Sequence, residues 1–371
     1  MGKIFKVMFK IIKWIFIVLV VIIALFFAVR FVGQQINRRT PKGGINETRY
    51  VDINGDQQWI SIYGQNTDNP VLLFLHGGPG SCTSDLDYPV LRKLSDIYTI
   101  VDWDQRACGL SWRPEQWGTQ VTYEEIYSDA IELTNYLRKE MGKDKISVMG
   151  ISSGAALGAN LVLDHPEYYE ELYALSLPVD QLEIQRAFKE AALEWTKDDS
   201  ELHEVAERII TEQAQYDSMT LEEQLDAINE QGLINSKYVT SDSLSDADVS
   251  LIATYIFNPY YSLKDYYNCY YASQPKSVEE YEDYNYYAAV VGMRAEGYKF
   301  SLLERTDYQV PVYIIMGDKD YTVMTPVTRA YYERITAPEK GYSEFEGGHF
   351  TPMLQTENLS AIVHAIVLNK A

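Results

Sequence analysis

The sequence predicts an α/β fold in which a mostly parallel sheet is flanked by helices, with an inserted helical cap and an N-terminal transmembrane helix. From residue 48 onward, short apolar runs of strand length alternate with amphipathic helical patterns, which is typical of parallel α/β sheets. The alternation stops between residues 180 and 305 and then resumes. Ahead of it, residues 14–29 are uncharged and apolar throughout. We therefore expect a basic segment (1–13), a transmembrane anchor (11–32), a linker (33–47), a first core segment (48–179), a helical cap (180–305) and a second core segment (306–371).

Charge and cysteine content exclude two classes of protein. The 371 residues carry a net charge of −21, yet residues 1–42 contain eight Lys or Arg and no acidic residue. The remainder holds 24 basic against 53 acidic side chains, so it repels nucleic-acid phosphates and favours cationic or amine-bearing ligands. The three cysteines (Cys82, Cys108 and Cys269) form an odd set without a C-x-x-C pair, so we expect neither a disulfide framework nor a cysteine zinc site.

The N-terminal apolar segment is expected to be a retained membrane anchor. Its sixteen apolar residues fall short of the roughly 20 needed to span a bilayer. Flanking Lys13 and Arg30 can extend toward the headgroups, which makes residues 11–32 a workable span. A cleaved signal peptide is the alternative, but no A-x-A-like cleavage site follows. Basic residues are nearly balanced across the span; counting the amino terminus favours an extracytoplasmic body, joined by the polar linker 33–47.

The body begins with an expected hairpin, residues 48–53 and 58–63, around Asn54-Gly55. Buried strands are expected at 71–75, 97–104, 145–150 and 171–177, with helices at 121–141 and 153–165. The first of these helices carries a capping box, Thr122 to Glu125. Within the cap, helical patterns cover 183–195 and 201–215, followed by twelve tyrosines between positions 255 and 298. The α/β alternation resumes with the segments 310–317, 325–335 and 341–348, and it ends with a helix over 358–368.

The motif Gly150-Ile151-Ser152-Ser153-Gly154 predicts a nucleophilic serine. It is a G-x-S-x-G sequence placed directly between an expected strand and an expected helix. A tight turn there forces the central residue into a strained backbone and exposes its hydroxyl above the sheet. The following helix N-terminus favours developing negative charge. The alternative is that Ser152 is a helix N-cap.

His349 is the expected general base for Ser152. Only five histidines are present, and His349 follows a strand in EFEGGHF, on the edge where α/β sheets place their sites. A hydrogen-bonded turn histidine is the alternative interpretation. The other four lie in a glycine turn (His76), at a helix end (His165), on a cap helix (His203) and in the last helix (His364).

The acid that orients the histidine should lie between Ser152 and His349 in the chain. The segment YIIMGDKDY ends a strand with Asp318 and Asp320. We favour Asp320, because it lies far enough past the strand to reach an imidazole, whereas Asp318 suits capping of the loop. Asp180, which follows an earlier strand, is the remaining alternative. Asp320 would hold the tautomer of His349 and stabilise its imidazolium form.

The glycine turn in VLLFLHGGPGS (71–81) is expected to bind an oxyanion. A phosphate-binding loop would require a lysine after Gly80, and none follows. A glycine turn after a sheet strand can instead donate a backbone N–H to a tetrahedral intermediate. Gly78 is the candidate donor here, and the N–H of Ser153 is the second.

Together these motifs resemble the prolyl aminopeptidase (proline iminopeptidase) group of α/β-hydrolases, peptidases of the S33 type. The resemblance covers about residues 48–370 apart from the cap, with HGGPG (76–80), DWDQRACGLS (102–111), GISSG (150–154), GDKD (317–320) and EGGHF (346–350) in the group's order. It implies an α/β-hydrolase fold and removal of an N-terminal residue, typically proline, from short peptides without metal or cofactor. It assigns the triad to Ser152, Asp320 and His349.

The sequence also departs from that group. The usual G-G-S-W-G has Ile151 and Ser153 around the serine, Ser81 replaces a glycine, and Ala107 replaces the glycine of DQRGCG. The resemblance implies cap carboxylates that bind the substrate amine, for which Glu296 is the candidate. The alternatives are an esterase or amidase of other specificity, or a non-catalytic binding protein on this fold.

Overall fold

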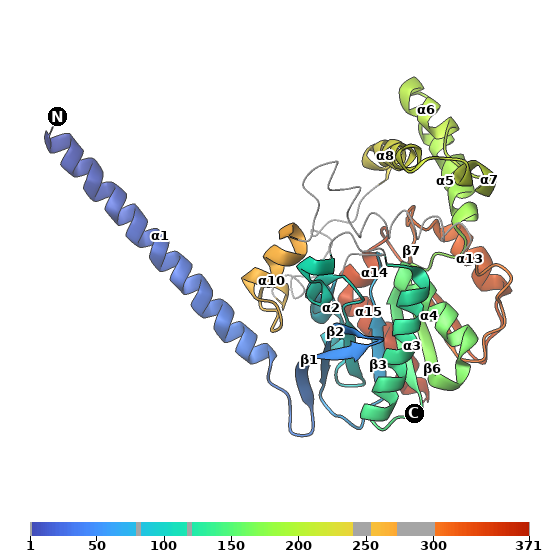
Figure 1. The fold of residues 1–371 in the computed structure, drawn as a ribbon, viewed down its shortest axis with the longest axis horizontal. Coiled ribbons are helices and arrows are strands. Elements are labelled where there is room, and N and C mark those ends of the chain that lie inside the picture. The colour runs from blue at the N-terminus through green and yellow to red at the C-terminus, as the bar shows by residue number, and fades with distance from the viewer. Residues whose placement is uncertain (1, 79–82, 117–120, 240–253, 273–300, 371) are drawn as a thin grey trace.

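The computed structural model describes residues 2–78, 83–116, 121–239, 254–272 and 301–370, and its centre is an eight-stranded sheet (Figure 1). The strand order is β1-β2-β4-β3-β5-β6-β7-β8. β2 pairs antiparallel with β1 and with β4, and all other neighbours are parallel. The strands are β1 (Ile45–Ile53), β2 (Asp56–Gly64), β3 (Val71–Leu75), β4 (Thr99–Trp103), β5 (Ile146–Ile151), β6 (Tyr169–Leu175), β7 (Val312–Gly317) and β8 (Lys340–Phe345).

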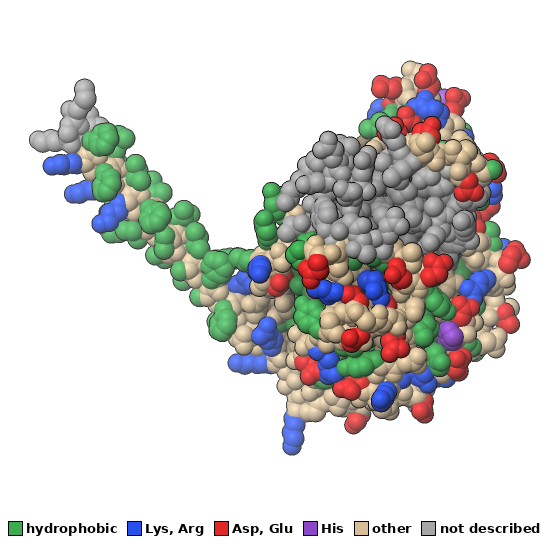
Figure 2. Space-filling model, viewed as in Figure 1, with side chains coloured by type: hydrophobic (Ala, Val, Ile, Leu, Met, Phe, Trp, Pro, Cys, Tyr) green, Lys and Arg blue, Asp and Glu red, His purple; other side chains and the backbone are tan. Residues whose placement is uncertain are grey.

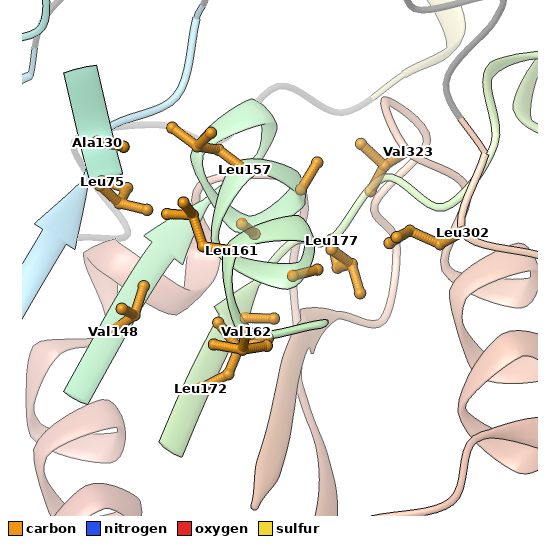
Figure 3. Packing of buried hydrophobic residues seen from close by; sticks show 14 of the residues in the cluster. Leu75, Ala130, Val148, Leu157, Leu161, Val162, Leu172, Leu177, Leu302 and Val323 are labelled. Carbon is orange, nitrogen blue, oxygen red and sulfur yellow. The ribbon is translucent and has the colours of Figure 1, made fainter. Parts of the chain in front are cut away.

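Helices cover both faces of the sheet, which explains why its central strands are apolar without alternation. Side chains from alternate positions of β3 enter two separate cores: Leu73 and Leu75 join one, Leu72 and Phe74 the other. The first core contains α3 (Tyr123–Glu140), α4 (Ser153–Asp164) and α13 (Thr325–Arg334); the second contains α2 (Ser84–Leu91) and α15 (Thr356–Lys370). Figure 3 shows Leu157, Leu161 and Val162 of α4 packed over Val148 of β5 and Leu172 of β6.

Several local predictions are confirmed. The opening hairpin turns at Asn54 and Gly55, both with positive φ, as a two-residue hairpin requires. Thr122 and Glu125 form the expected capping box at the start of α3. The strands that close the sheet, β7 and β8, also lie where the sequence places them.

The cap segment contains α5 (Gln181–Trp195), α6 (Ser200–Glu207), α7 (Gln213–Asp217), α8 (Leu221–Tyr238), α10 (Leu263–Tyr267) and a π-helical turn (Asn268–Ala272). The prediction of one helical stretch over 201–215 is wrong, because α6 ends at Glu207 and a non-helical break precedes α7. Ile209 and Ile210 lie in this break and are both buried. Burial of these two apolar side chains outweighs the intrinsic helix preference of the segment.

The N-terminal helix α1 (Gly2–Asn37) extends away from the body (Figure 1). It is the one helix among the described residues that is long and apolar enough to cross a membrane. Its most apolar window has a mean hydropathy of 3.2 and is only 6% buried, which is unlike the core helix of a soluble protein. Figure 2 shows its exposed hydrophobic side chains, with basic residues at the far end.

The predicted linker 33–47 is wrong at both of its ends. Residues 33–37 continue α1, and β1 already begins at Ile45. The helix is prolonged because its last turns contact the body: Gln34 Nε2 donates to the carbonyl of Asn258 at 2.8 Å, and Asn37 Nδ2 to that of Phe257 at 2.9 Å. Tertiary contact, invisible in the local composition, thus sets the end of the helix.

Candidate active site

Ser152 occupies a strained turn between β5 and α4. Its backbone has φ 55° and ψ −125°, a conformation that non-glycine residues rarely adopt. Gly150 and Gly154 permit the turn, because a Cβ on Gly150 would overlap the carbonyl of Gly154, and one on Gly154 the carbonyl of Leu75. The N–H of Ser152 donates to Leu175 O at 2.9 Å. Only glycine fits two positions before and two positions after this serine, which accounts for the motif.

His349 and Asp320 are in direct contact. Asp320 lies three residues beyond the end of β7, and His349 follows the end of β8. The distance from His349 Nδ1 to Asp320 Oδ2 is 2.8 Å, and the Asp320 side chain is fully buried. The other carboxylate oxygen, Oδ1, accepts hydrogen bonds from the N–H groups of Thr322 and Val323. The carboxylate is therefore fixed by its own turn, and it contacts the imidazole through Nδ1, so Nε2 is the ring nitrogen that could transfer a proton.

The two alternative acids have other roles. Asp318 Oδ1 accepts a hydrogen bond from the N–H of Gly347 at 2.8 Å and so closes the loop that carries His349. Asp180 caps α5 by accepting from the N–H of Glu183 at 2.8 Å.

Ser176 links the serine turn to the histidine loop, and sequence reasoning missed it. It follows Leu175, the residue whose carbonyl accepts from Ser152 N–H. Its Oγ donates to the carbonyl of His349 at 2.6 Å, and its own N–H donates to Ile315 O of β7 at 2.9 Å. Two consecutive residues at the end of β6 thus hold both loops at the carboxyl edge of the sheet. The signal available in the sequence was a serine within the apolar run 171–177.

The remaining histidines have partners other than Ser152 and Asp320. His165 stacks on Tyr168, His203 Nδ1 lies 3.1 Å from Thr196 Oγ1, and His364 Nε2 lies 3.1 Å from Asp96. His76 is buried, and burial lowers the pKa of its imidazole to about 4, so the ring is neutral at pH 7.

The glycine turn lies directly against the serine turn. A Cβ on Gly77 would stand 3.1 Å from both Ser152 Cβ and Ile151 O. Gly78, the predicted oxyanion donor, has φ 123°, a backbone that favours glycine. His76 holds the turn, since its Nε2 accepts from the N–H of Gln105 at 3.2 Å. Residues 79–82 lie outside the described residues, as does Glu296, the predicted amine-binding carboxylate.

Packing of Gly77 against Ser152 leads to a prediction. The Gly77→Ala variant should lower kcat by about 10- to 100-fold, because its methyl group displaces the serine by a fraction of an ångström. A Cβ added at Gly232 in α8 would meet no atom within 4 Å, so Gly232→Ala is the matched control. That control should keep kcat and gain about 0.5–1 kcal/mol of stability. Equal kcat values for Gly77→Ala and wild type would contradict the packing argument.

The loop after β4 is held by an ion pair and by a hydrogen bond within the loop. Arg106 forms a bidentate ion pair with the buried Asp129 of α3, with N–O distances of 2.7 and 2.8 Å. Asp104 Oδ2 accepts from the N–H of Leu110 at 2.6 Å. Burial raises the pKa of Asp104 to about 7. The DQRACG motif therefore supports the glycine turn through Gln105 and is itself held to the helix layer.

The raised pKa of Asp104 predicts a loss of stability as the pH rises. An exposed aspartate has a pKa of about 3.9, so from pH 4 to 7 the folded protein holds a proton that the unfolded chain has lost. The resulting stabilisation is complete below pH 4 and is lost as the pH rises through about 7. At pH 8, Asp104→Asn should exceed wild type by roughly 1–4 kcal/mol in free energy of unfolding, and at pH 4 the two should agree. Denaturant unfolding across this range tests it, with the exposed Asp68→Asn as control; parallel curves for Asp104→Asn and wild type would refute it.

Across the described residues, no group of three or more His, Cys, Asp or Glu side chains could hold a metal ion. Among the described residues, Cys108 and Cys269 take part in no disulfide.

The strand order and the serine turn at the carboxyl edge of the sheet define an α/β hydrolase. A sequence profile described as "alpha/beta hydrolase fold" matches residues 70–355. The chain belongs to this family.

Its relatives include named peptidases. The probable aminopeptidase YbaC of Bacillus subtilis (strain 168) is 24% identical over 341 residues, covering 86% of this chain and 95% of the relative. A proline iminopeptidase of Thermoplasma volcanium is 27% identical over 152 residues, covering 39% of this chain and 48% of the relative.

Solved structures share the fold at lower identity. The proline iminopeptidase of Mycobacterium smegmatis superimposes with a TM-score of 0.55 at 18% identity, covering 87% of this chain and 98% of its own. An epoxide hydrolase of Vigna radiata superimposes with a TM-score of 0.52 at 20% identity, covering 87% of this chain and 98% of its own. Because proteins of different activity align equally well, this likeness concerns the fold alone.

Proposed function

We propose that the protein is a membrane-anchored serine hydrolase, an aminopeptidase of the proline iminopeptidase type that removes the N-terminal residue of short peptides. The observation that carries this proposal is the 2.8 Å contact between His349 and the buried Asp320, on a loop tied through Ser176 to the turn of Ser152.

The proposed chemistry is acyl transfer through Ser152. Its Oγ attacks the carbonyl carbon of the first residue of the peptide, while His349 Nε2 takes the hydroxyl proton. The N–H groups of Gly78 and Ser153 bind the oxyanion. As the tetrahedral intermediate collapses, the C–N bond breaks and His349 returns the proton to the departing amine. Water then hydrolyses the acyl-enzyme by the same route, and the free amino acid is released.

Three features support a peptide substrate. A relative that matches 86% of this chain is named a probable aminopeptidase, and others are named proline iminopeptidases. The motifs HGGPG and DQRACG resemble those of that group. The acidic body favours a substrate with a protonated amino group. In this proposal the protein's own side chains and backbone carry the reaction, and neither cofactor nor metal takes part.

Anchoring through α1 is part of the proposal, with the body on the extracytoplasmic side. Retention of the helix is supported by its continuity, because α1 runs unbroken from the apolar segment to Gln34 and Asn37, which donate hydrogen bonds to the body. Protease accessibility of the body in intact cells tests on which side of the membrane it lies. We expect an added protease to digest the body, and full protection would place the body in the cytoplasm.

A hydrolysis screen of the full-length protein in detergent or nanodiscs tests the activity. We expect release of the arylamine from prolyl- and other aminoacyl-arylamides, and labelling by a fluorophosphonate probe. Turnover of simple esters without turnover of any aminoacyl-arylamide would refute the aminopeptidase. Absence of both turnover and labelling would refute the hydrolase and favour a non-catalytic binding protein.

An esterase or amidase of other specificity is the second candidate. It is favoured by Ile151 and Ser153 beside the nucleophile, where the prolyl aminopeptidase group usually has glycine and tryptophan. The same screen separates the two candidates, because an esterase would prefer uncharged acyl groups over aminoacyl groups.

A further inference from the structure

We propose that residues 254–272 form a second membrane contact of the body, beside the anchor. Four exposed side chains of this segment, Ile256, Leu263, Tyr267 and Tyr271, would lie in the headgroup region of the bilayer; we call them the interfacial face. The inference rests on the proposed anchoring through α1 and adds to it the orientation of the body at the membrane surface.

The first argument is depth. The expected span ends at residue 32, so Arg30 lies near the boundary between hydrocarbon and headgroups. Arg30 is 8% exposed, and its Nη2 donates to the carbonyl of Tyr261 at 2.8 Å. Gln34, one turn later, donates to the carbonyls of Asn258 and Tyr261. Residues 258–261 are thereby placed beside the part of α1 that leaves the bilayer.

The second argument is rigidity of the junction. Gly33 lets the helix approach Phe257 so closely that a Cβ would overlap its ring. Asn37 Nδ2 donates to Phe257 O at 2.9 Å, and Arg38 donates through Nε and Nη2 to Pro259 O. The Arg30 guanidinium also lies over the ring of Tyr266, 5.9 Å from its centroid. Side chains along about two turns of α1 hold the short segment 257–261, so the depth of this segment relative to the bilayer follows that of the anchor.

The third argument is the chemistry of the interfacial face. Leu263, Tyr267 and Tyr271 recur every four residues, which places them on one side of the helical run 263–272. They are 48%, 55% and 53% exposed, and Ile256 is 40% exposed. Tyrosine is enriched at membrane–water interfaces, where its ring is apolar and its hydroxyl is hydrated. Figure 1 shows α10 next to α1, where Figure 2 shows hydrophobic side chains at the body surface.

A bilayer explains this face better than a protein partner does, because the face adjoins the span and lies at the depth of its end. The segment also reaches the interior of the body: the Tyr261 hydroxyl pairs with Ser84 Oγ, and both interact with the Asp104 carboxyl. A membrane contact at residues 254–272 would therefore fix the body relative to the bilayer close to the loop that supports the glycine turn.

Photo-crosslinking of the full-length protein in phosphatidylcholine–phosphatidylglycerol nanodiscs tests the inference. Tyr267→p-benzoylphenylalanine and Tyr271→p-benzoylphenylalanine place the probe on the interfacial face, with phospholipid adducts read by mass spectrometry. Leu368 on α15 is the matched control, since it is apolar, 67% exposed and three residues from the C-terminus, which Figure 1 marks on the side of the body away from α1. Phe26 within α1 is the positive control. At positions 267 and 271 we expect at least about fivefold more lipid adduct than at position 368.

The controls separate this inference from the proposed anchor. Lipid adducts at Phe26, with none above the Leu368 level at positions 267 and 271, would overturn the interfacial face and leave the anchor intact. Adducts at positions 267 and 271 to a second copy of the chain, in place of lipid, would overturn it in favour of a protein contact. Absence of lipid adducts at Phe26 as well would overturn the anchor and the inference with it.

Discussion

Replacement of Ser152 by alanine should lower kcat by about 10⁴- to 10⁶-fold on every arylamide or ester that the wild-type protein hydrolyses. The hydroxyl is the proposed nucleophile, and its loss leaves only the oxyanion donors and substrate binding to assist attack by water. The variant should also lose fluorophosphonate labelling. Its thermal unfolding should stay close to that of wild type, since the strained backbone at position 152 is retained.

Ser153→Ala is the informative comparison for Ser152→Ala. Only the backbone N–H of Ser153 has a proposed role, so this variant should keep its labelling and most of its turnover. If Ser153 were the nucleophile, the two variants would exchange their behaviour. Retained turnover in Ser152→Ala at wild-type rates would remove the serine mechanism altogether.

Asp320→Asn should lower kcat by about 10⁴-fold with little change in substrate binding. Asparagine preserves the shape of the side chain, but its amide favours the wrong tautomer of His349 and provides no charge for the imidazolium. The 2.8 Å contact with Nδ1 and the full burial of the carboxylate are the basis for so large an effect. Steady-state measurement of kcat and KM on the best substrate checks it.

Asp318→Asn provides the control, because Asp318 lies two residues away and is exposed. Its oxygen accepts from Gly347 N–H, and the amide oxygen of asparagine can do the same. We expect less than about a tenfold change in kcat. A larger loss in Asp318→Asn than in Asp320→Asn would show that the acid has been assigned to the wrong residue.

Local sequence determined those parts of the fold that depend on neighbouring residues. The apolar run 71–75 forms β3, and Asn54-Gly55 turns the first hairpin, because strand burial and positive φ leave few alternatives. G-x-S-x-G between a strand and a helix placed Ser152 in its strained turn for the same reason. The order of motifs along the chain then indicated the family to which the chain belongs.

Tertiary structure alone decided the contacts between residues that are distant in the chain. Ser176 donates to the carbonyl of a residue 173 positions away, and no local pattern encodes such a pairing. Gly77 proved to be the glycine that packs on Ser152, although sequence reasoning had singled out only its neighbour Gly78. The last turns of α1 are helical because residues 257–261 accept their hydrogen bonds. The composition of residues 33–37 predicts a loop. The free energy gained when the end of α1 packs on the body outweighs this preference, because local preferences amount to less than about 1 kcal/mol per residue.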